Sequence, residues 1–227
     1  MKSLATLIIL FTSISLFSQN IIDKKVGEFK ELKVYDLISV NLVKSDINKV
    51  VIEGKNTQDV VINNKNGTLK IKMNLEESFD GNQTSVTVFY TNIDIIDANE
   101  GWSADGYLAL LPDLQAAKVQ LIEQPLPAGD DDALRNLPRP IALCADETCH
   151  DRRSLAALKG KYDMVNIKLD KTGGLTEALN LARRAKEKGL TLMVGNMTGT
   201  SLAMAPAYVV AQLCDFVDLD GALFLGE

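Results

Sequence analysis

Two rhythms of hydrophobic and polar positions divide this chain near Asp97. Between residues 21 and 96, apolar residues alternate with polar ones in runs such as "KVVIEG", "NGTLKIK" and "VTVFYTNIDII". This period of two predicts strands with one buried and one solvated face. After Asp97, fully apolar runs of strand length alternate with helical stretches. That order predicts a parallel sheet covered on both faces.

Two local signals are specific enough to place single elements. Asn66 and Gly67 lie between alternating runs, and they predict a tight hairpin turn because both residues tolerate a positive φ. From Leu175 to Lys188, apolar residues recur at helical spacing on one face. We therefore expect an amphipathic helix there, with Gly189 as its C-terminal stop.

The composition changes at the same place as the rhythm. Residues 1–96 hold 11 Lys and no Arg against 11 acidic residues, with one Ala and no Pro. Residues 97–227 hold 13 basic and 19 acidic residues, with 19 Ala and all 6 Pro. The net charge of −6 therefore lies in the second part, and no basic surface suggests a nucleic-acid partner. A fusion of two unrelated segments explains this contrast better than one continuous gene product.

The N-terminus has the pattern of a secretory signal peptide. Lys2 precedes an apolar run from Leu4 to Phe17, and polar residues follow at Ser18. The run is too short to span a bilayer as a helix, which needs about 20 residues. We expect a signal peptide over residues 1–18 and export to the periplasm or cell envelope. The alternative is a buried first helix.

Polar residues end the apolar runs of the second part at regular intervals. They are Asp97, Glu123, Asp146, Lys168, Asn196 and Asp220, spaced by 22 to 28 residues, or one strand–helix unit per gap. In a (β/α)₈ barrel such strand ends meet at one mouth, where active sites lie. Carboxylates suit Mg²⁺, and a lysine beside them suits proton abstraction next to a carboxylate. Any single acid is more simply a helix N-cap or loop residue, and Asp97 alone would also suit a hairpin turn.

The second part resembles a family of enzymes. "DANEGW", "LIEQPL", "ADE", "NIKLDKTGG", "GNMTGTSLA" and "DLDG" follow each other as in dipeptide epimerases of the muconate-lactonising branch of the enolase superfamily, of the L-Ala-D/L-Glu epimerase type. The resemblance implies strands 3 to 8 of a TIM barrel, a dipeptide substrate and Mg²⁺, with proton abstraction by lysine and a metal-stabilised enediolate. It implies three residue roles: metal ligands Asp97, Glu123 and Asp146; acid/base Lys168; and the substrate-ammonium pair Asp218 and Asp220.

The first part resembles the GIN-type adhesin head domain of exported bacterial proteins. The pattern is "GEFKELKVYDLISVNLVKSD", "KVVIEG", "NGTLKIK" and "VTVFYTNIDII". The resemblance implies a small all-β segment at a cell surface without catalysis. We therefore divide the chain into a signal peptide (1–18), an all-β segment (19–96) and a partial α/β barrel (97–227). The alternative function is a non-catalytic envelope protein that carries the barrel fragment as a passenger.

Several parts of an epimerase are missing from this sequence. The resemblance implies a second lysine base on the strand before Asp97. Lys72 in "LKIK" has suitable spacing. No amphipathic helix follows it, however, so we do not expect Lys72 to be catalytic. The first two barrel units and the capping domain are also absent. We therefore expect impaired activity and an open barrel whose exposed edges favour self-association.

The remaining residues with reactive or titratable side chains have simpler interpretations. Lys171 and Glu147 are expected either to contact and support the site residues or to be purely structural. The single histidine, His150, is expected in a loop. Three cysteines, an odd number without metal spacing, are expected to be reduced, which would suit a cytoplasmic barrel better than an exported one.

Overall fold

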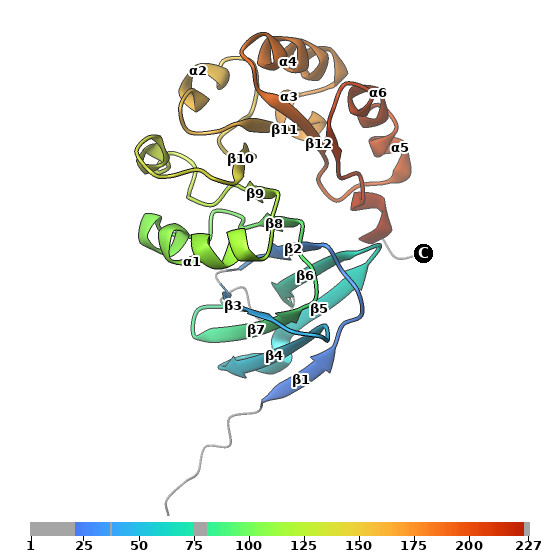
Figure 1. Ribbon diagram of the computed structural model, residues 1–227. Coiled ribbons are helices and arrows are strands. Elements are labelled where there is room, and N and C mark those ends of the chain that lie inside the picture. Colours follow the sequence, from blue (N-terminus) through green and yellow to red (C-terminus); the bar gives the residue numbers. More distant parts are fainter. Residues whose placement is uncertain (1–20, 37, 75–80, 225–227) are drawn as a thin grey trace, which may run out of the picture.

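The computed structural model describes residues 21–36, 38–74 and 81–224, which form two sheets with helices around the larger one (Figure 1). The expected signal peptide lies outside the described residues. Within the described part of the chain, no helix is long and apolar enough to cross a membrane.

The smaller sheet comes entirely from the expected all-β segment. Its strand order is β1 (Ile22–Lys25), β4 (Lys49–Gly54), β7 (Thr84–Tyr90) and β3 (Ser39–Lys44). β4 pairs antiparallel with β1 and β7, whereas β3 pairs parallel with β7. Alternate residues of β7 are buried, which gives the sheet the one apolar face that the period of two predicts.

The larger sheet has nine strands and is curled (Figure 1). Its order is β13 (Phe216–Val217), β12 (Thr191–Gly195), β11 (Met164–Lys168), β10 (Ala142–Ala145), β9 (Leu121–Glu123), β8 (Ile95–Asp97), β2 (Glu31–Val34), β6 (Thr68–Met73) and β5 (Val60–Lys65). All neighbours run parallel except β5 and β6. The expected partial α/β barrel is therefore present as a curled, mostly parallel sheet.

The all-β segment supplies three strands of this curled sheet. β2 pairs in parallel with β8, with Leu32 opposite Ile96 and Lys33 opposite Asp97. The expectation of an exposed edge at the strand that ends in Asp97 is therefore wrong. The physical reason is that β2 supplies partners for the backbone N–H and C=O groups that an edge strand leaves unpaired.

The two faces of β2 and β6 serve different purposes. Leu32, Leu69 and Ile71 lie on one face and are buried in the main apolar core. Lys33 and Lys70, on the opposite face, line the space inside the curled sheet. The face that period-two alternation predicts to be solvated thus forms one wall of an internal cavity.

The two elements that local signals placed are confirmed. β5 and β6 form a hairpin, and its turn residues Asn66 and Gly67 have φ values of 52° and 85°. The amphipathic helix α4 (Leu175–Glu187) buries Ala178, Leu181, Ala182 and Ala185, and Gly189 follows with φ 77°.

The other helices follow the strands of the curled sheet. They are α1 (Ala104–Ala116), α2 (Leu155–Leu158), α3 (Leu169–Thr172), α5 (Ser201–Met204) and α6 (Ala207–Ala211), with 3₁₀ turns at Thr57–Asp59, Asp132–Arg135 and Gly221–Phe224. α1 begins after Ser103, whose side chain accepts a hydrogen bond from the Gly106 N–H at 3.1 Å. This N-cap satisfies a donor that the helix itself leaves free.

Because both parts share one core, damage to the all-β segment should destabilise the barrel part. We expect Leu69→Ala to lower the free energy of unfolding by about 2–5 kcal/mol, as buried leucines do. The same shift should appear in the fluorescence of Trp102, the only tryptophan. Leu202→Ala is the control, since Leu202 is 82% exposed. A Trp102 transition that Leu69→Ala leaves unmoved would contradict a shared core.

Candidate functional site

The carboxyl ends of four consecutive strands place the expected site residues around one region. Asp97, Glu123 and Lys168 are the last residues of β8, β9 and β11, and Asp146 directly follows β10. All three carboxylates are buried. Parallel strands bring their carboxyl ends to the same edge of the sheet, so these side chains approach one another although 71 positions separate Asp97 from Lys168.

A cavity of about 610 Å³ opens at these strand ends. Asp97 and Lys168 line it from the barrel part, together with Asp218 and Asp220 after β13. The all-β segment lines it with Tyr35, Asp36, Val61, Asn63 and three lysines, Lys33, Lys70 and Lys72. The cavity therefore has walls from both parts of the chain.

Burial and mutual repulsion make two of the carboxylates hard to ionise. Burial, with the charge of Asp146 adding to it and that of Lys33 opposing it, raises the pKa of Asp97 to about 7. Burial together with the charges of Asp97 and Asp146 raises the pKa of Glu123 to about 8. Asp97 and Glu123 are therefore partly protonated near neutral pH.

Asp146 is the carboxylate that the chain neutralises best. Lys168 and Lys171 both donate hydrogen bonds to its side chain. Burial alone would raise the pKa of Asp146, but the two ammonium groups outweigh it and lower this pKa. Lys171 was expected to support the site residues or to be structural, and its hydrogen bond to the candidate metal ligand Asp146 agrees with the first of these roles. Its place one helical turn after Lys168, in "KLDK", is the only signal for this contact in the sequence.

Lys168 is held as an ammonium group in this arrangement. Burial lowers its pKa, but the charges of Asp146 and Glu123 outweigh burial and raise it above the usual value. A base must lose this proton, so the state described here needs another positive charge near the carboxylates before Lys168 could act.

Glu123 has a buried carboxylate oxygen that lacks a hydrogen-bond partner among the residues that the structure describes. One of its carboxylate oxygens accepts a hydrogen bond from the Asn166 side chain at 2.6 Å, and the other is buried without a hydrogen-bond partner. A buried unpaired carboxylate oxygen is costly. Oxygen donors from Asp97, Glu123 and Asp146 are the kind that hard divalent cations bind, so the donor set fits Mg²⁺. Among the described residues, however, no three His, Cys, Asp or Glu side chains converge closely enough to hold one ion.

The expected ammonium-binding pair is engaged by two lysines of the all-β segment. Lys33 donates to Asp218, and the Lys70 Nζ lies 3.2 Å from an Asp220 oxygen. Lys33 also lies 3.4 Å from Glu31 on its own strand. Lys33 and Lys70 were not expected at the site, although the alternation in "ELKV" and "TLKI" puts each on the polar face of its strand.

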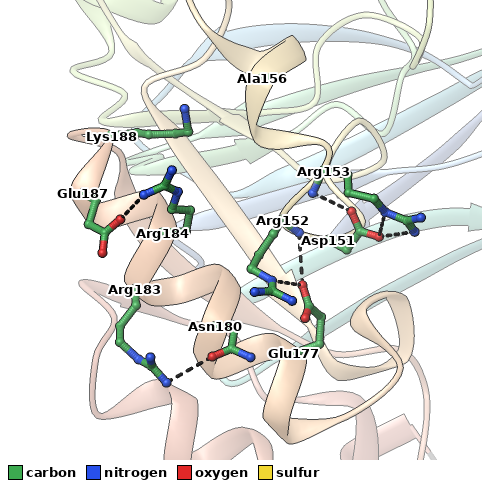
Figure 2. Close-up of a pocket in the computed structure, with 10 residues that line it drawn as sticks. All are labelled: Asp151, Arg152, Arg153, Ala156, Glu177, Asn180, Arg183, Arg184, Glu187 and Lys188. Carbon is green, nitrogen blue, oxygen red and sulfur yellow. Dashed lines mark hydrogen bonds and ion pairs between the residues drawn. The ribbon is translucent and has the colours of Figure 1, made fainter.

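A second hollow lies on the outer surface between the loop before α2 and helix α4, and Figure 2 shows its charged lining. It is larger, about 870 Å³, but three of its four arginines form ion pairs: Arg152 with Glu177, Arg153 with Asp151 and Arg184 with Glu187. The fourth, Arg183, donates a hydrogen bond to the Asn180 side chain. These exposed pairs make a solvated helix surface. We therefore place the functional site at the strand ends.

The cysteines and the histidine take no part in the site. Cys144, Cys149 and Cys214 are free thiols, as expected. His150 is exposed in the loop before α2, as expected.

Comparison with known families matches both parts of the chain. The family "Enolase C-terminal domain-like" matches residues 85–219. The head GIN domain of auto-transporter adhesins matches residues 28–109. The two matches overlap over residues 85–109, which include β7 for the most part, β8 and the expected junction at Asp97.

Individual relatives resemble the second part closely. The chain is 53% identical over 131 residues to an N-acetyl-D-glutamate racemase of Pseudoalteromonas sp, covering 58% of this chain and 42% of the relative. It is also 53% identical over 131 residues to the L-Ala-D/L-Glu epimerase of Escherichia coli K12, covering 58% of this chain and 41% of that protein. The chain thus spans less than half the length of these relatives.

Solved structures agree with the sequence relatives. One is an enolase family member from Agrobacterium tumefaciens with homology to dipeptide epimerases, with bound sodium and L-Ala-L-Glu; it is 54% identical with a TM-score of 0.58, over 60% of this chain and 41% of its own. Another is the dipeptide epimerase of Methylococcus capsulatus with Mg and L-Arg-D-Lys, 35% identical with a TM-score of 0.56, over 60% of this chain and 40% of its own. Since the family match extends over more than half of the sequence, this chain belongs to the enolase C-terminal domain-like family.

Proposed function

We propose that this chain carries part of an Mg²⁺-dependent epimerase that moves a proton at the α-carbon of amino-acid derivatives such as dipeptides. The observation that carries the proposal is the set of three buried carboxylates and one lysine on consecutive parallel strand ends, beside a cavity of about 610 Å³. The epimerase and racemase relatives support the reaction class.

In this proposal Asp97, Glu123 and Asp146 hold the metal ion. When bound, Mg²⁺ would supply Lewis-acid stabilisation of the charge that develops on the substrate carboxylate. Lys168 lines the cavity and takes or returns the proton on one face of the α-carbon. Lys171 and Asn166 are positioning residues, because they fix the carboxylates of Asp146 and Glu123.

The second face of the α-carbon is the weak point of the proposed reaction. β2 lies four places from β11 in the sheet order, so Lys33 enters the cavity from a wall distant from Lys168. Burial lowers the pKa of Lys33, but Asp218 and Glu31 outweigh burial and keep this pKa well above its usual range. Lys168 pairs with the proposed metal ligand Asp146, so a bound cation would weaken its hold on the proton, whereas Asp218 and Glu31 are not proposed ligands and would keep Lys33 a cation and a poor base. The proposed outcome is proton exchange with one stereoisomer and little inversion.

A competing proposal is a non-catalytic exported protein. The match of residues 28–109 to the adhesin head domain supports it, and also supports export. The sheet edge at β5 would in that case bind a partner or a second copy. Under this proposal the carboxylates at the strand ends bind no metal ion.

Added Mg²⁺ should stabilise the folded chain. A ligand at 100 times its dissociation constant adds about 2.7 kcal/mol to the free energy of unfolding, so millimolar Mg²⁺ should give a gain of about 1–3 kcal/mol in thermal or urea unfolding. Asp146→Asn should abolish this gain because it removes a proposed ligand. Asp132→Asn, at a side chain 81% exposed, should keep it. A wild-type chain whose free energy of unfolding does not change with Mg²⁺ would favour the competing proposal.

The metal-free chain should lose stability as the pH rises from about 5 to 8. The folded state keeps the protons of Asp97 and Glu123 up to about pH 7 and 8, while the unfolded chain releases them near pH 4 to 5, so rising pH favours unfolding. The slope for one such proton is about 1.4 kcal/mol per pH unit.

The pH experiment has a matched pair of variants. Glu123→Gln should reduce the loss of stability measured by urea unfolding between pH 5 and 8, leaving the part that Asp97 contributes. Glu177→Gln should not, because its pKa is lowered by Arg152 and it is already ionised throughout this window. A wild-type stability that stays level or rises over these pH values would refute the raised pKa values.

Lys168→Ala should abolish proton exchange at the α-carbon. In deuterated water with Mg²⁺, proton NMR of L-Ala-L-Glu and its D-Glu isomer should show exchange of one isomer by the wild type. The variant should be slower by about 10²–10⁴-fold, the usual contribution of a general base. Lys159→Ala, at an exposed lysine, is the control. Rapid interconversion of both isomers would instead reveal a second base.

A further inference from the structure

A buried chain of hydrogen bonds adjoins the strand ends that carry the candidate metal ligands, and the proposed reaction uses none of its side chains. Its members are Gln124, Asp131, Thr148, Lys161 and Tyr162. All of them are at most 4% exposed except Thr148, which is half-buried. Polar side chains this deeply buried are costly unless each one finds a hydrogen-bond partner, so the partners of this chain are worth following from one end to the other.

Asp131 anchors one end of the chain. Its carboxylate accepts hydrogen bonds from the Lys161 ammonium group at 2.5 Å and from the hydroxyl groups of Tyr162 and Thr148, each at 2.8 Å. Burial would raise the pKa of Asp131, but the hydrogen bonds from these three side chains outweigh burial and lower this pKa. Because an ionised carboxylate only accepts hydrogen bonds, both hydroxyl groups must donate to it, and their oxygen atoms remain as acceptors.

Gln124 lies at the other end of the chain. Its side-chain nitrogen donates to the hydroxyl oxygens of Tyr162 at 2.8 Å and Thr148 at 2.9 Å, and to the Leu126 carbonyl oxygen at 2.8 Å. Three acceptors on this side fix the orientation of the amide, so its oxygen atom faces the opposite way. That oxygen accepts hydrogen bonds from the backbone N–H groups of Asp146 at 3.0 Å and Thr148 at 3.2 Å.

The backbone of Gln124 also links the neighbouring strands. Its N–H donates to the Cys144 carbonyl oxygen in β10 at 2.9 Å, and its carbonyl oxygen accepts from the Glu100 N–H, after β8, at 2.8 Å. Gln124 has a φ of 33°, in the left-handed region that residues other than glycine rarely adopt. Such a conformation costs free energy and persists only when the surrounding contacts hold it. The contacts of the Gln124 side chain and backbone do so here.

We propose that Gln124 is a positioning residue of the proposed metal site, held in place by the charge of Asp131 through two hydroxyl groups. The inference rests on the proposed function, because it concerns the same three carboxylates. Lys168 and Lys171 contact the side chain of Asp146, whereas Gln124 holds its backbone. Gln124 therefore acts on the ligands rather than on the substrate.

Amide hydrogen exchange in the metal-free chain tests the positioning directly. The amides compared are those of Asp146 and Thr148, with that of Val165 in β11 as the reference. Gln124→Met keeps the length of the side chain and removes its hydrogen-bonding groups. In this variant the first two amides should exchange about tenfold faster relative to the reference, the change expected for one lost hydrogen bond. A general loss of stability would speed exchange at all three amides and leave the ratio unchanged.

Variants at the two hydroxyl groups test the role of Asp131 as the anchor. Tyr162→Phe/Thr148→Val removes both links between Asp131 and Gln124, and it should raise the exchange ratio as Gln124→Met does. Tyr162→Phe/Thr148→Ser keeps one hydroxyl group and should restore part of the wild-type ratio. Asp132→Asn is the control for charge: Asp132 also lies 3.3 Å from the Lys161 ammonium group, but its side chain is 81% exposed, so the ratio should not change.

The outcome does not depend on one variant. If a methionine or double variant does not fold, the single variants Thr148→Val and Thr148→Ser take its place, with a larger shift expected for valine. An unchanged ratio in the folded variants would overturn the inference. The same shift in the serine and valine variants would overturn it as well, because the hydroxyl group would then have no role.

Magnesium binding distinguishes this inference from the proposed function. Calorimetry of the full chain should show a Mg²⁺ affinity about tenfold weaker in Gln124→Met, a usual effect of losing a group that orients metal ligands. A wild-type chain that binds no Mg²⁺ would refute the proposed function, and the exchange ratio alone would then decide whether Gln124 positions Asp146. A shifted exchange ratio with an unchanged Mg²⁺ affinity would overturn the role of Gln124 in the metal site.

Discussion

The backbone pairing of β2 with β8 is the interaction on which the rest of this structure depends. It covers the strand edge that the barrel part would otherwise expose, and it does so with a segment whose composition differs sharply from that of the barrel. The register then has a chemical consequence, since it sets Lys33 directly opposite Asp97. A strand that completes the sheet thereby brings a cation to the carboxylates.

Charge balance in a buried region is the second constraint. Asp97, Glu123 and Asp146 are all buried near one another, and each charge makes the others harder to ionise. The chain compensates with lysines: Lys168 and Lys171 on Asp146, and Lys33 on Asp218 within reach of Asp97. These ammonium groups stabilise the site, and the proposed divalent cation would compete with them for the same oxygens.

The apolar core shows why the change in composition at Asp97 is no boundary in the packing. One continuous cluster of buried side chains includes Val50 and Val88 of the small sheet, Leu69 of β6 and Val194 of β12. Polar–apolar alternation in β2 and β6 allows this, because one face packs on the small sheet while the other faces the cavity. The same strands therefore contribute both to the core and to the candidate site.

The sequence by itself determined the elements whose signals are local. The helix from Leu175, the hairpin at Asn66-Gly67 and the strand ends at Asp97, Glu123, Asp146 and Lys168 follow from periodicity, turn chemistry and spacing. Only the tertiary structure decided which strand covers β8 and what Lys33, Lys70 and Lys171 contact. Alternation assigns Lys33 to a polar face, but the pattern is the same whether that face meets water or a carboxylate from a distant strand. Which of the two it meets depends on strand pairing between residues far apart in the chain, and no local sequence signal reports that pairing.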